Sequence, residues 1–232
     1  MKTATHPAHA PYVTHADLGG RLGYGRIHPE PEGVLFHASW EPRVLALTLA
    51  AGATGAWNLD ISRSARETLP DYARLTYYEI WFAALWKLLI QHELVTPREA
   101  ASGSARTRAR PVPRKLMASD VAASLARGSP THRSIELPAR YAVGDAVRLY
   151  ASEIPHHTRL PRYMRGKVGT VERVHGAHVF ADAHALGRGE DPRWLYTVAV
   201  RGTDLWPAQE DAHEAERLTV SIDAWEPYLE PA

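Results

Sequence analysis

The chain has 232 residues, 45% of them hydrophobic and 23% charged, so its composition is that of a globular protein rather than a disordered or membrane-embedded one. Its 27 Lys and Arg nearly balance its 26 Asp and Glu, which argues against a general electrostatic attraction to nucleic acid or anionic lipid. It contains no Cys, which excludes disulfides, thiolate catalysis and a Cys-ligated metal supplied by this chain.

The first segment, residues 1–36, contains several Gly, Pro and His and follows neither a helical nor a strand period. We therefore expect an extended N-terminal arm that lies on another part of the molecule. The arm has no apolar run that could serve as a signal-peptide core, and the chain has no uninterrupted apolar stretch of about 18 residues. These absences lead us to expect a cytoplasmic protein.

Two helices are predicted after the arm. Residues 37–51 are rich in helix formers, and Ser39 is the expected N-cap, before Gly residues stop the helix. A second, short helix is expected to begin at Asn58 or Asp60 and to end at Pro70.

A third and longer helix is predicted over 71–94, and Thr96-Pro97 is expected to open a further short one. One apolar stripe on the long helix has a spacing of three to four residues; it consists of Leu75, Tyr78, Phe82, Leu85 and Leu89. Trp81 and Leu88 lie off that stripe, so the helix is expected to lie between its own core and a partner surface. Residues 37–100 are thus predicted to form a helical domain.

Residues 101–140 are predicted to be a linker with a short helix at 119–127. The first part, residues 101–115, holds five basic residues, no acidic ones and two prolines. It lacks the interleaved aromatic residues of a surface that binds single-stranded nucleic acid, so we interpret it as a solvated tether.

After the linker the pattern changes to short strands separated by turns, which predicts a small antiparallel SH3-like β-barrel over 141–232. The predicted strand segments are 141–151, 166–180, 193–202 and 217–225. Gly144 and Gly169 are expected at tight turns or bulges. The predicted fold class is α+β, in the order arm, helices, linker, barrel.

Common enzyme motifs are missing from the chain. It has no phosphate-binding loop, no G-x-S-x-G and no H-E-x-x-H. Several histidines cluster without regular ligand spacing, and we interpret them as surface or structural residues: His156, His157, His175, His178 and His184. No metal site is expected within this chain.

The informative features are two arginine-bearing segments, NLDISR at 58–63 and HTRLPRYMRGKVGT at 157–170. Further motifs are TYYE at 76–79, HADLGG at 15–20 followed by GYG at 23–25, and the ending WEPYLEPA at 225–232. With these motifs, the sequence resembles the β subunits of nitrile hydratases. The motifs occur in that family's order and span nearly the whole chain.

The resemblance implies that nitriles are hydrated to amides at an interface with a separate α subunit, in an αβ or α2β2 assembly. In that family the α subunit carries a low-spin Co(III) or Fe(III) ion, and the β subunit supplies no metal ligand. By motif, the arginines that contact oxidised cysteine oxygens fall on Arg63 and Arg159, and the pocket tyrosine falls on Tyr77. Guanidinium suits that contact because it stays protonated and offers a planar fork of donors.

The candidate residues for the substrate pocket are Leu59, Ser62, Tyr78 and Trp81. For Tyr78 core packing is the favoured alternative, while Trp81 is favoured for the pocket and is more typical of the cobalt type. Ser62 departs from the family pattern, in which the residue before the helix arginine is commonly large and apolar, so the pocket could be wider or more polar here.

Two other functions are considered. Thiocyanate hydrolase is a relative with the same metal centre, but it divides the β-like part between two polypeptides, whereas here residues 101–140 join the two parts. A non-catalytic accessory protein related to the β subunit is the second alternative, and the presence of both Arg63 and Arg159 argues against it.

Overall fold

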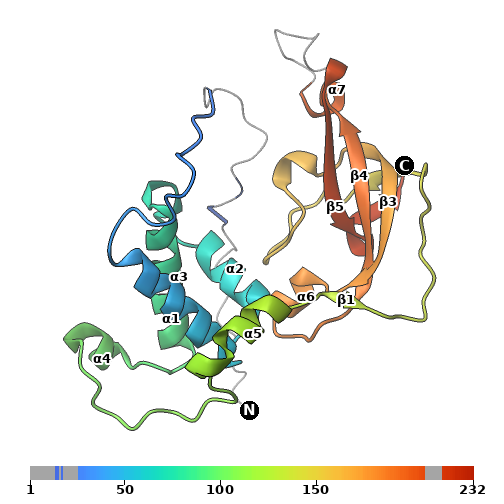
Figure 1. Ribbon diagram of the computed structural model, residues 1–232. Helices are drawn as coiled ribbons and strands as arrows, with labels where there is room; N and C mark the ends of the chain where they lie inside the picture. Colours follow the sequence, from blue (N-terminus) through green and yellow to red (C-terminus); the bar gives the residue numbers. More distant parts are fainter. Residues whose placement is uncertain (1–13, 16, 18–25, 207–215) are drawn as a thin grey trace, which may run out of the picture.

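The computed structural model describes residues 14, 15, 17, 26–206 and 216–232. Helices make up its first part and an antiparallel sheet its last part, which confirms the α+β class (Figure 1). The described residues of the arm, 14, 15, 17 and 26–36, contain no helix or strand. No helix among the described residues is long and apolar enough to cross a membrane.

The helical part is built from three main helices and a short 3-10 turn: α1 (Glu41–Ala53), α2 (Leu59–Glu67), η1 (Tyr72–Arg74) and α3 (Tyr77–Gln91). The predicted start of α1 was wrong, because Trp40 and not Ser39 is its N-cap residue. The buried Glu41 instead accepts a hydrogen bond from the His37 backbone N–H at 2.6 Å, which orders the entry to the helix. The start of α2 at Asn58 is confirmed, since the Asn58 side chain accepts from the Ile61 N–H at 2.8 Å.

The single helix predicted over 71–94 is also wrong at its beginning. The short η1 turn is followed by Leu75 in extended conformation, and Thr76 starts α3 as the first residue of a capping box. In this box the Glu79 carboxylate accepts from the Thr76 backbone N–H at 2.8 Å. The local cap therefore interrupts the apolar period that suggested one continuous helix.

The core of the helical part lies where α1 and α2 pack on α3. Its buried members are Trp57, Ala65, Leu69, Ala84, Leu85 and Leu88. The predicted stripe was wrong at Phe82, which is exposed, and Leu88 is buried although it lies off the stripe. The buried face of α3 is rotated from the predicted one because both α1 and α2 pack on it.

The connecting segment contains the two short helices that were predicted, α4 (Pro97–Ser102) and α5 (Val121–Arg127), with a 3-10 turn η2 (Ala118–Asp120) before α5. Glu99 organises the region after α4. Its carboxylate accepts the backbone N–H groups of Arg106 and Thr107 at 2.7 and 2.9 Å, besides that of Thr96 at 3.0 Å. These hydrogen bonds, that of Arg106 most of all, hold the pKa of Glu99 well below its usual value of 4.5.

Replacing Glu99 with Gln is expected to release the Arg106–Thr107 loop, because an amide cannot accept from all three N–H groups. Hydrogen–deuterium exchange of the Arg106 and Thr107 amides should then become faster at neutral pH. Since the folded-state pKa is depressed, the contacts are present above the ordinary pKa of the carboxyl and are lost as pH falls through the lowered value. Glu136→Gln, an exposed change in the same connecting segment, should leave that exchange unaltered.

The sheet confirms the four predicted strands and adds two short ones. The strands are β1 (His132–Arg133), β2 (Ala146–Leu149), β3 (Val168–His178), β4 (Arg193–Arg201), β5 (Thr219–Trp225) and β6 (Leu229–Pro231). Their order is β5-β4-β3-β2-β6, with β1 paired to β3, and every pairing is antiparallel. Pairings among the described residues leave β5 and β6 at opposite edges, so they establish an antiparallel sheet and not a closed barrel.

Short elements decorate the sheet: η3 (Arg162–Met164), α6 (Ala181–Ala185), α7 (Gly202–Leu205) and η4 (Glu226–Tyr228). The two glycines predicted at turns behave differently. Gly144 has φ +96° and lies in a turn, as predicted. Gly169 lies within β3 opposite Val147, and a Cβ there would meet the Ala199 carbonyl oxygen at 2.5 Å, so this glycine permits close backbone approach rather than a turn.

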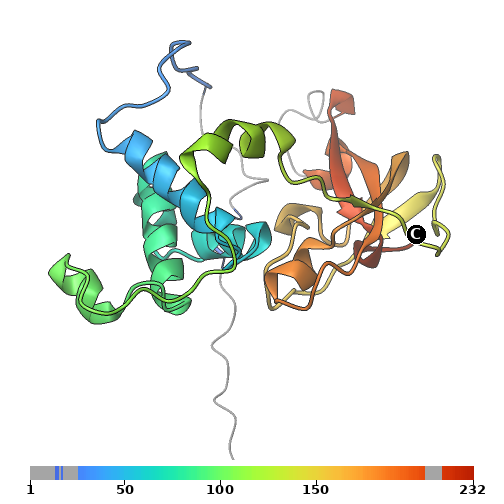
Figure 2. The ribbon, with the colours of Figure 1, turned by 60° about the horizontal axis from the view of Figure 1, so that its bottom comes forward.

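The helical part and the sheet meet through α2 and α6, which lie side by side in both ribbon views (Figures 1 and 2). Figure 2 also shows α5 and the segment after it running from the helices across to β1. The α2–α6 contact positions the candidate site.

Candidate functional site

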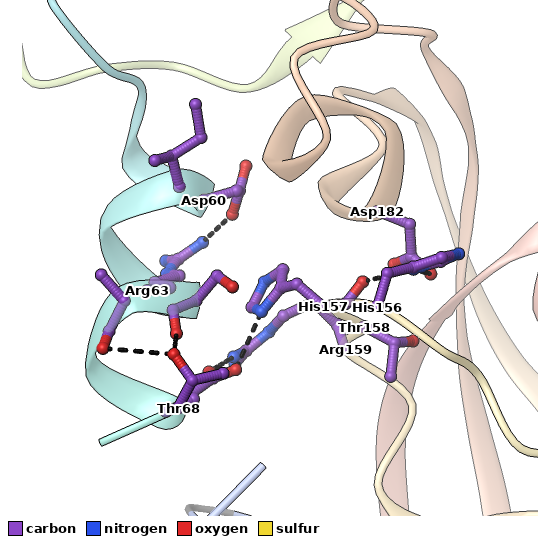
Figure 3. A network of polar contacts seen from close by, with 12 residues as sticks. Asp60, Arg63, Thr68, His156, His157, Thr158, Arg159 and Asp182 are labelled. Carbon is purple, nitrogen blue, oxygen red and sulfur yellow. Dashed lines mark hydrogen bonds and ion pairs between the residues drawn. The ribbon is translucent and has the colours of Figure 1, made fainter. Parts of the chain in front are cut away.

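The candidate site follows one face of α2. Asp60, Arg63 and Glu67 are spaced so that they lie along the same side of the helix, over about two turns. This side is turned toward the sheet part of the chain, from which the loop at 156–160 and α6 approach it (Figure 3). Each of the two carboxylates on this face contacts one arginine and one histidine.

At the start of α2, Asp60 is buried and its two oxygens have different partners. Arg63 Nη1 donates to Oδ1 at 2.9 Å, and His184 Nδ1 lies 2.8 Å from Oδ2. The Asn58 side chain also donates to the His184 carbonyl at 2.6 Å. The first turn of α2 is thereby attached to α6.

At the end of α2, Glu67 forms a similar pair of contacts. Arg159 Nη1 lies 3.3 Å from one carboxylate oxygen, and His157 Nδ1 lies 2.8 Å from the other. His157 is almost fully buried, while the Arg159 side chain is 43% exposed. Arg159 therefore contacts the helix that carries Arg63, at Glu67, which is one turn after Arg63.

Within the described part of the chain, both candidate arginines keep donors that have no hydrogen-bond acceptor. Arg63 is 39% exposed and Arg159 is 43% exposed, and each uses one terminal nitrogen in its ion pair with α2. Since a guanidinium carries five N–H donors, the remaining ones can bind an anionic group presented from outside the chain. Both arginines are thus bound to carboxylates of the same helix.

The backbone next to Arg159 is held by a buried pair, Tyr228 and Asp182. The Tyr228 hydroxyl donates to the Asp182 carboxylate, and it accepts from the Thr158 hydroxyl and the Arg159 N–H, both at 3.1 Å. Burial raises the pKa of both groups above their ordinary values. Figure 3 shows Thr158 on the loop that carries Arg159, with Asp182 beside it.

Tyr77 lies at the first position of α3, and its side chain is 64% exposed. Its ring lies 5.1 Å from that of Tyr78 and 5.5 Å from that of Trp81. The Arg66 guanidinium covers the Trp81 ring at 4.4 Å, and its burial lowers the pKa of this arginine. Tyr77, Tyr78 and Trp81 therefore form an aromatic wall, and Arg66 of α2 lies against the Trp81 ring of this wall.

The remaining candidate pocket residues are placed differently from one another. Leu59 is exposed at the first position of α2, and Tyr78 and Trp81 are half-buried. Ser62 is buried, and its hydroxyl accepts from Arg66 at 3.2 Å. Ser62 thus contacts the aromatic wall through Arg66.

A cavity of about 270 Å³ lies beside Arg159 and Glu67. The arm reaches this region, since Thr14 and Asp17 line the cavity. The His15 N–H donates to the Glu67 carbonyl at 2.7 Å, and Asp17 accepts from the Arg162 N–H at 3.1 Å. Most of the HADLGG and GYG motifs at 15–25 lie outside the described residues.

Sequence reasoning missed the residues that hold the arginines. Asp60, Glu67, His157 and Tyr228 lie within or near the motif segments and His184 lies outside them, but the histidines and Tyr228 contact partners that are distant along the chain. The spacing of Asp60, Arg63 and Glu67 on one helical face was the one signal available.

Among the described residues, no group of three or more His, Asp or Glu is arranged to hold a metal ion.

Comparison with known proteins gives two family matches that together cover most of the chain. Residues 13–125 match the family model of the nitrile hydratase beta subunit, N-terminal, and residues 130–231 match that of the nitrile hydratase beta subunit, C-terminal.

Individual relatives agree over nearly their full lengths. The chain is 38% identical to the low-molecular weight cobalt-containing nitrile hydratase subunit beta of Rhodococcus rhodochrous, with 93% of this chain and 98% of the relative covered. It is 34% identical to the nitrile hydratase subunit beta of Pseudomonas putida, again over 93% and 98%. Among solved structures, recombinant apo thiocyanate hydrolase from Thiobacillus thioparus is 32% identical over 41% of this chain and 78% of that chain, with a TM-score of 0.38.

Proposed function

The chain belongs to the nitrile hydratase β-subunit family, and on this premise we propose that it hydrates nitriles to amides in complex with a separate α subunit. The observation that carries the proposal is the pairing of Arg63 and Arg159 with carboxylates of one helix, each arginine with donors to spare. In the proposed complex, the exposed parts of the Arg63 and Arg159 side chains face the partner's active centre.

Arg63 and Arg159 are proposed to donate hydrogen bonds to the oxygens of oxidised cysteines on the α subunit. Asp60 and Glu67 support this role because each binds one terminal nitrogen of a guanidinium, whose other N–H groups have no acceptor among the described residues. Lysine could not reproduce the contact, since it presents a single ammonium on a flexible stem.

Tyr77 is proposed to line the nitrile pocket and to donate its phenolic hydrogen to the substrate nitrogen or to a water. Its exposure at the start of α3 supports this role. Leu59, Tyr78 and Trp81 would form apolar wall, and Ser62 would act through Arg66, which adds a cation behind that wall.

The metal is proposed to be cobalt, held by the α subunit in an αβ or α2β2 assembly. This chain has no Cys, and its described residues offer no cluster of ligands, so they do not fit a metal site of their own. Two relatives, those of Rhodococcus rhodochrous and Pseudonocardia thermophila, are named as cobalt-containing. When bound by the partner, such an ion supplies Lewis-acid polarisation of the nitrile.

The proposed function is tested by purifying the chain in complex with its α subunit and assaying two substrates. We expect amide to form from a small nitrile, and little carbonyl sulfide from thiocyanate. Carbonyl sulfide without amide would indicate a thiocyanate hydrolase instead. An α subunit that is equally active with and without this chain would indicate an accessory protein.

Replacing Tyr77 with Phe in that complex is expected to lower kcat about tenfold, the effect of losing one hydrogen bond of roughly 1.4 kcal/mol in the transition state. The phenyl ring keeps the contact with Trp81, so the assembled complex should remain. Steady-state kinetics measure the effect, and Tyr150→Phe on the sheet side serves as the control. Unchanged kinetics for Tyr77→Phe would remove Tyr77 from the proposed site.

A further inference from the structure

We propose that His184, at the end of the sheet-side helix α6, is a positioning residue for Arg63 and acts through Asp60. This inference rests on the proposed function of Arg63 and adds to it a residue from the other half of the chain. His184 would set where the helix arginine points without touching substrate or metal.

Both oxygens of the Asp60 carboxylate are occupied, one by Arg63 and the other by His184. Asp60 is 5% exposed, with Arg63 on Oδ1 at 2.9 Å and His184 on Oδ2 at 2.8 Å. A buried carboxylate with both oxygens bound has one orientation in which both hydrogen bonds form. The position of the Arg63 guanidinium therefore depends on the histidine across the carboxylate.

His184 holds the same turn of α2 at a second point. Its carbonyl accepts from the Asn58 side-chain amide at 2.6 Å, while the Asn58 oxygen caps the helix through the Ile61 N–H. One residue of α6 thus contacts both the N-cap of α2 and the carboxylate in its first turn. Two contacts fix the direction of the helix as well as its distance from α6.

Helix α6 connects the contacts of Arg63 to those of Arg159. α6 directly follows β3, and the loop that carries Arg159 packs against it through the Tyr228–Asp182 hydrogen bond. The element that holds Arg63 through Asp60 is therefore also attached to the backbone of Arg159. We infer that His184 keeps the two arginines at the spacing that the oxidised cysteines require.

Without His184, one oxygen of Asp60 would lose its partner in a buried position, which is unfavourable for a carboxylate. Asp60 would then be free to rotate, and Arg63 would lose its fixed acceptor. Partners of this kind change activity about 10- to 100-fold when they are removed from metalloenzyme sites.

The test uses the αβ complex and three variants. His184→Leu removes the donor, and His184→Asn keeps a donor near the position of Nδ1. His175→Leu is the matched control, because His175 is a half-buried histidine of the sheet with a 2.7 Å hydrogen bond to Thr197, and its side chain is 25% exposed against 22% for His184.

We expect kcat to fall at least about tenfold in His184→Leu, to recover largely in His184→Asn, and to stay near wild type in His175→Leu. The visible absorption of the metal–sulfur centre should shift in His184→Leu in the same direction as in Arg63→Lys, since both alter hydrogen bonding to the oxidised sulfurs. Equal losses in His184→Leu and His184→Asn, or an unshifted absorption, would overturn the proposal.

A double-mutant cycle separates this inference from the proposed function. In an Arg63→Lys background, His184→Leu should cause little further loss, because its effect passes through Arg63. Full additivity of the two losses would show a structural role for His184 and overturn the inference, while Arg63 would keep its role. Wild-type activity in Arg63→Lys would instead defeat the proposed function itself.

Discussion

Exchanging Arg63 for Lys is expected to lower kcat for nitrile hydration by about 100- to 1000-fold, the usual cost of losing one preorganised donor to an anionic centre. Lys keeps the charge and can keep an ion pair with Asp60, but it cannot also present a planar fork to the partner's oxygens. Because Arg63 is partly exposed on α2, the fold and the complex should survive the change. Arg159→Lys is expected to give a loss of similar size.

The measurement is kcat of complexes with matched metal content, determined together with their assembly state. Arg127→Lys, in the last turn of α5, is an exposed arginine change of the same chemistry and should have wild-type kinetics. If Arg63→Lys and Arg127→Lys are equally active, the guanidinium fork has no part in the reaction.

Replacing Gly169 with Ala is expected to destabilise the sheet by about 2–3 kcal/mol, and so to lower the melting temperature by roughly 5–10 °C. The added Cβ would lie 2.5 Å from the Ala199 carbonyl oxygen and 2.7 Å from a Val198 methyl. Relief requires β3 and β4 to separate, because the nearest of these atoms belongs to the backbone. Since β3 leads into α6, the arginine spacing should also suffer.

Thermal unfolding of the chain measures this effect, with Gly52→Ala as the control. Gly52 lies in α1 with open space around the position of a Cβ, so Ala should be neutral there or stabilise the helix by about 0.5–1 kcal/mol. A Gly169→Ala variant as stable as the wild type would contradict the close contact between β3 and β4 at this position.

The sequence allowed the main elements to be predicted because their signals are local. The Asn58 cap and the turns that bound the segments of β3 and β4 are readable within a few residues. The break before α3 was also local, in the Thr76–Glu79 capping box, but the apolar residues on both sides concealed it. Two-residue β1 could not be predicted, since it depends on contacts such as the ion pair of Arg133 with the distant Glu190.

In the candidate site, too, residues with a local sequence signal were predicted and residues with only distant contacts were not. Arg63, Arg159 and Tyr77 were found through motifs, because each lies in a segment that resembles the family. The histidines that hold the carboxylates were interpreted only as surface or structural residues. His184 and Asp60 are 124 positions apart, and no local pattern in one sequence indicates that they meet.

The most direct measurement is a crystal structure of the αβ complex with its oxidised metal centre. The account predicts that guanidinium nitrogens of Arg63 and Arg159 lie within about 3.2 Å of oxygens on the partner's oxidised cysteines, with Asp60 and Glu67 still bound behind them. A complex in which either guanidinium points into bulk water, or contacts only its own α2 carboxylate, would contradict it.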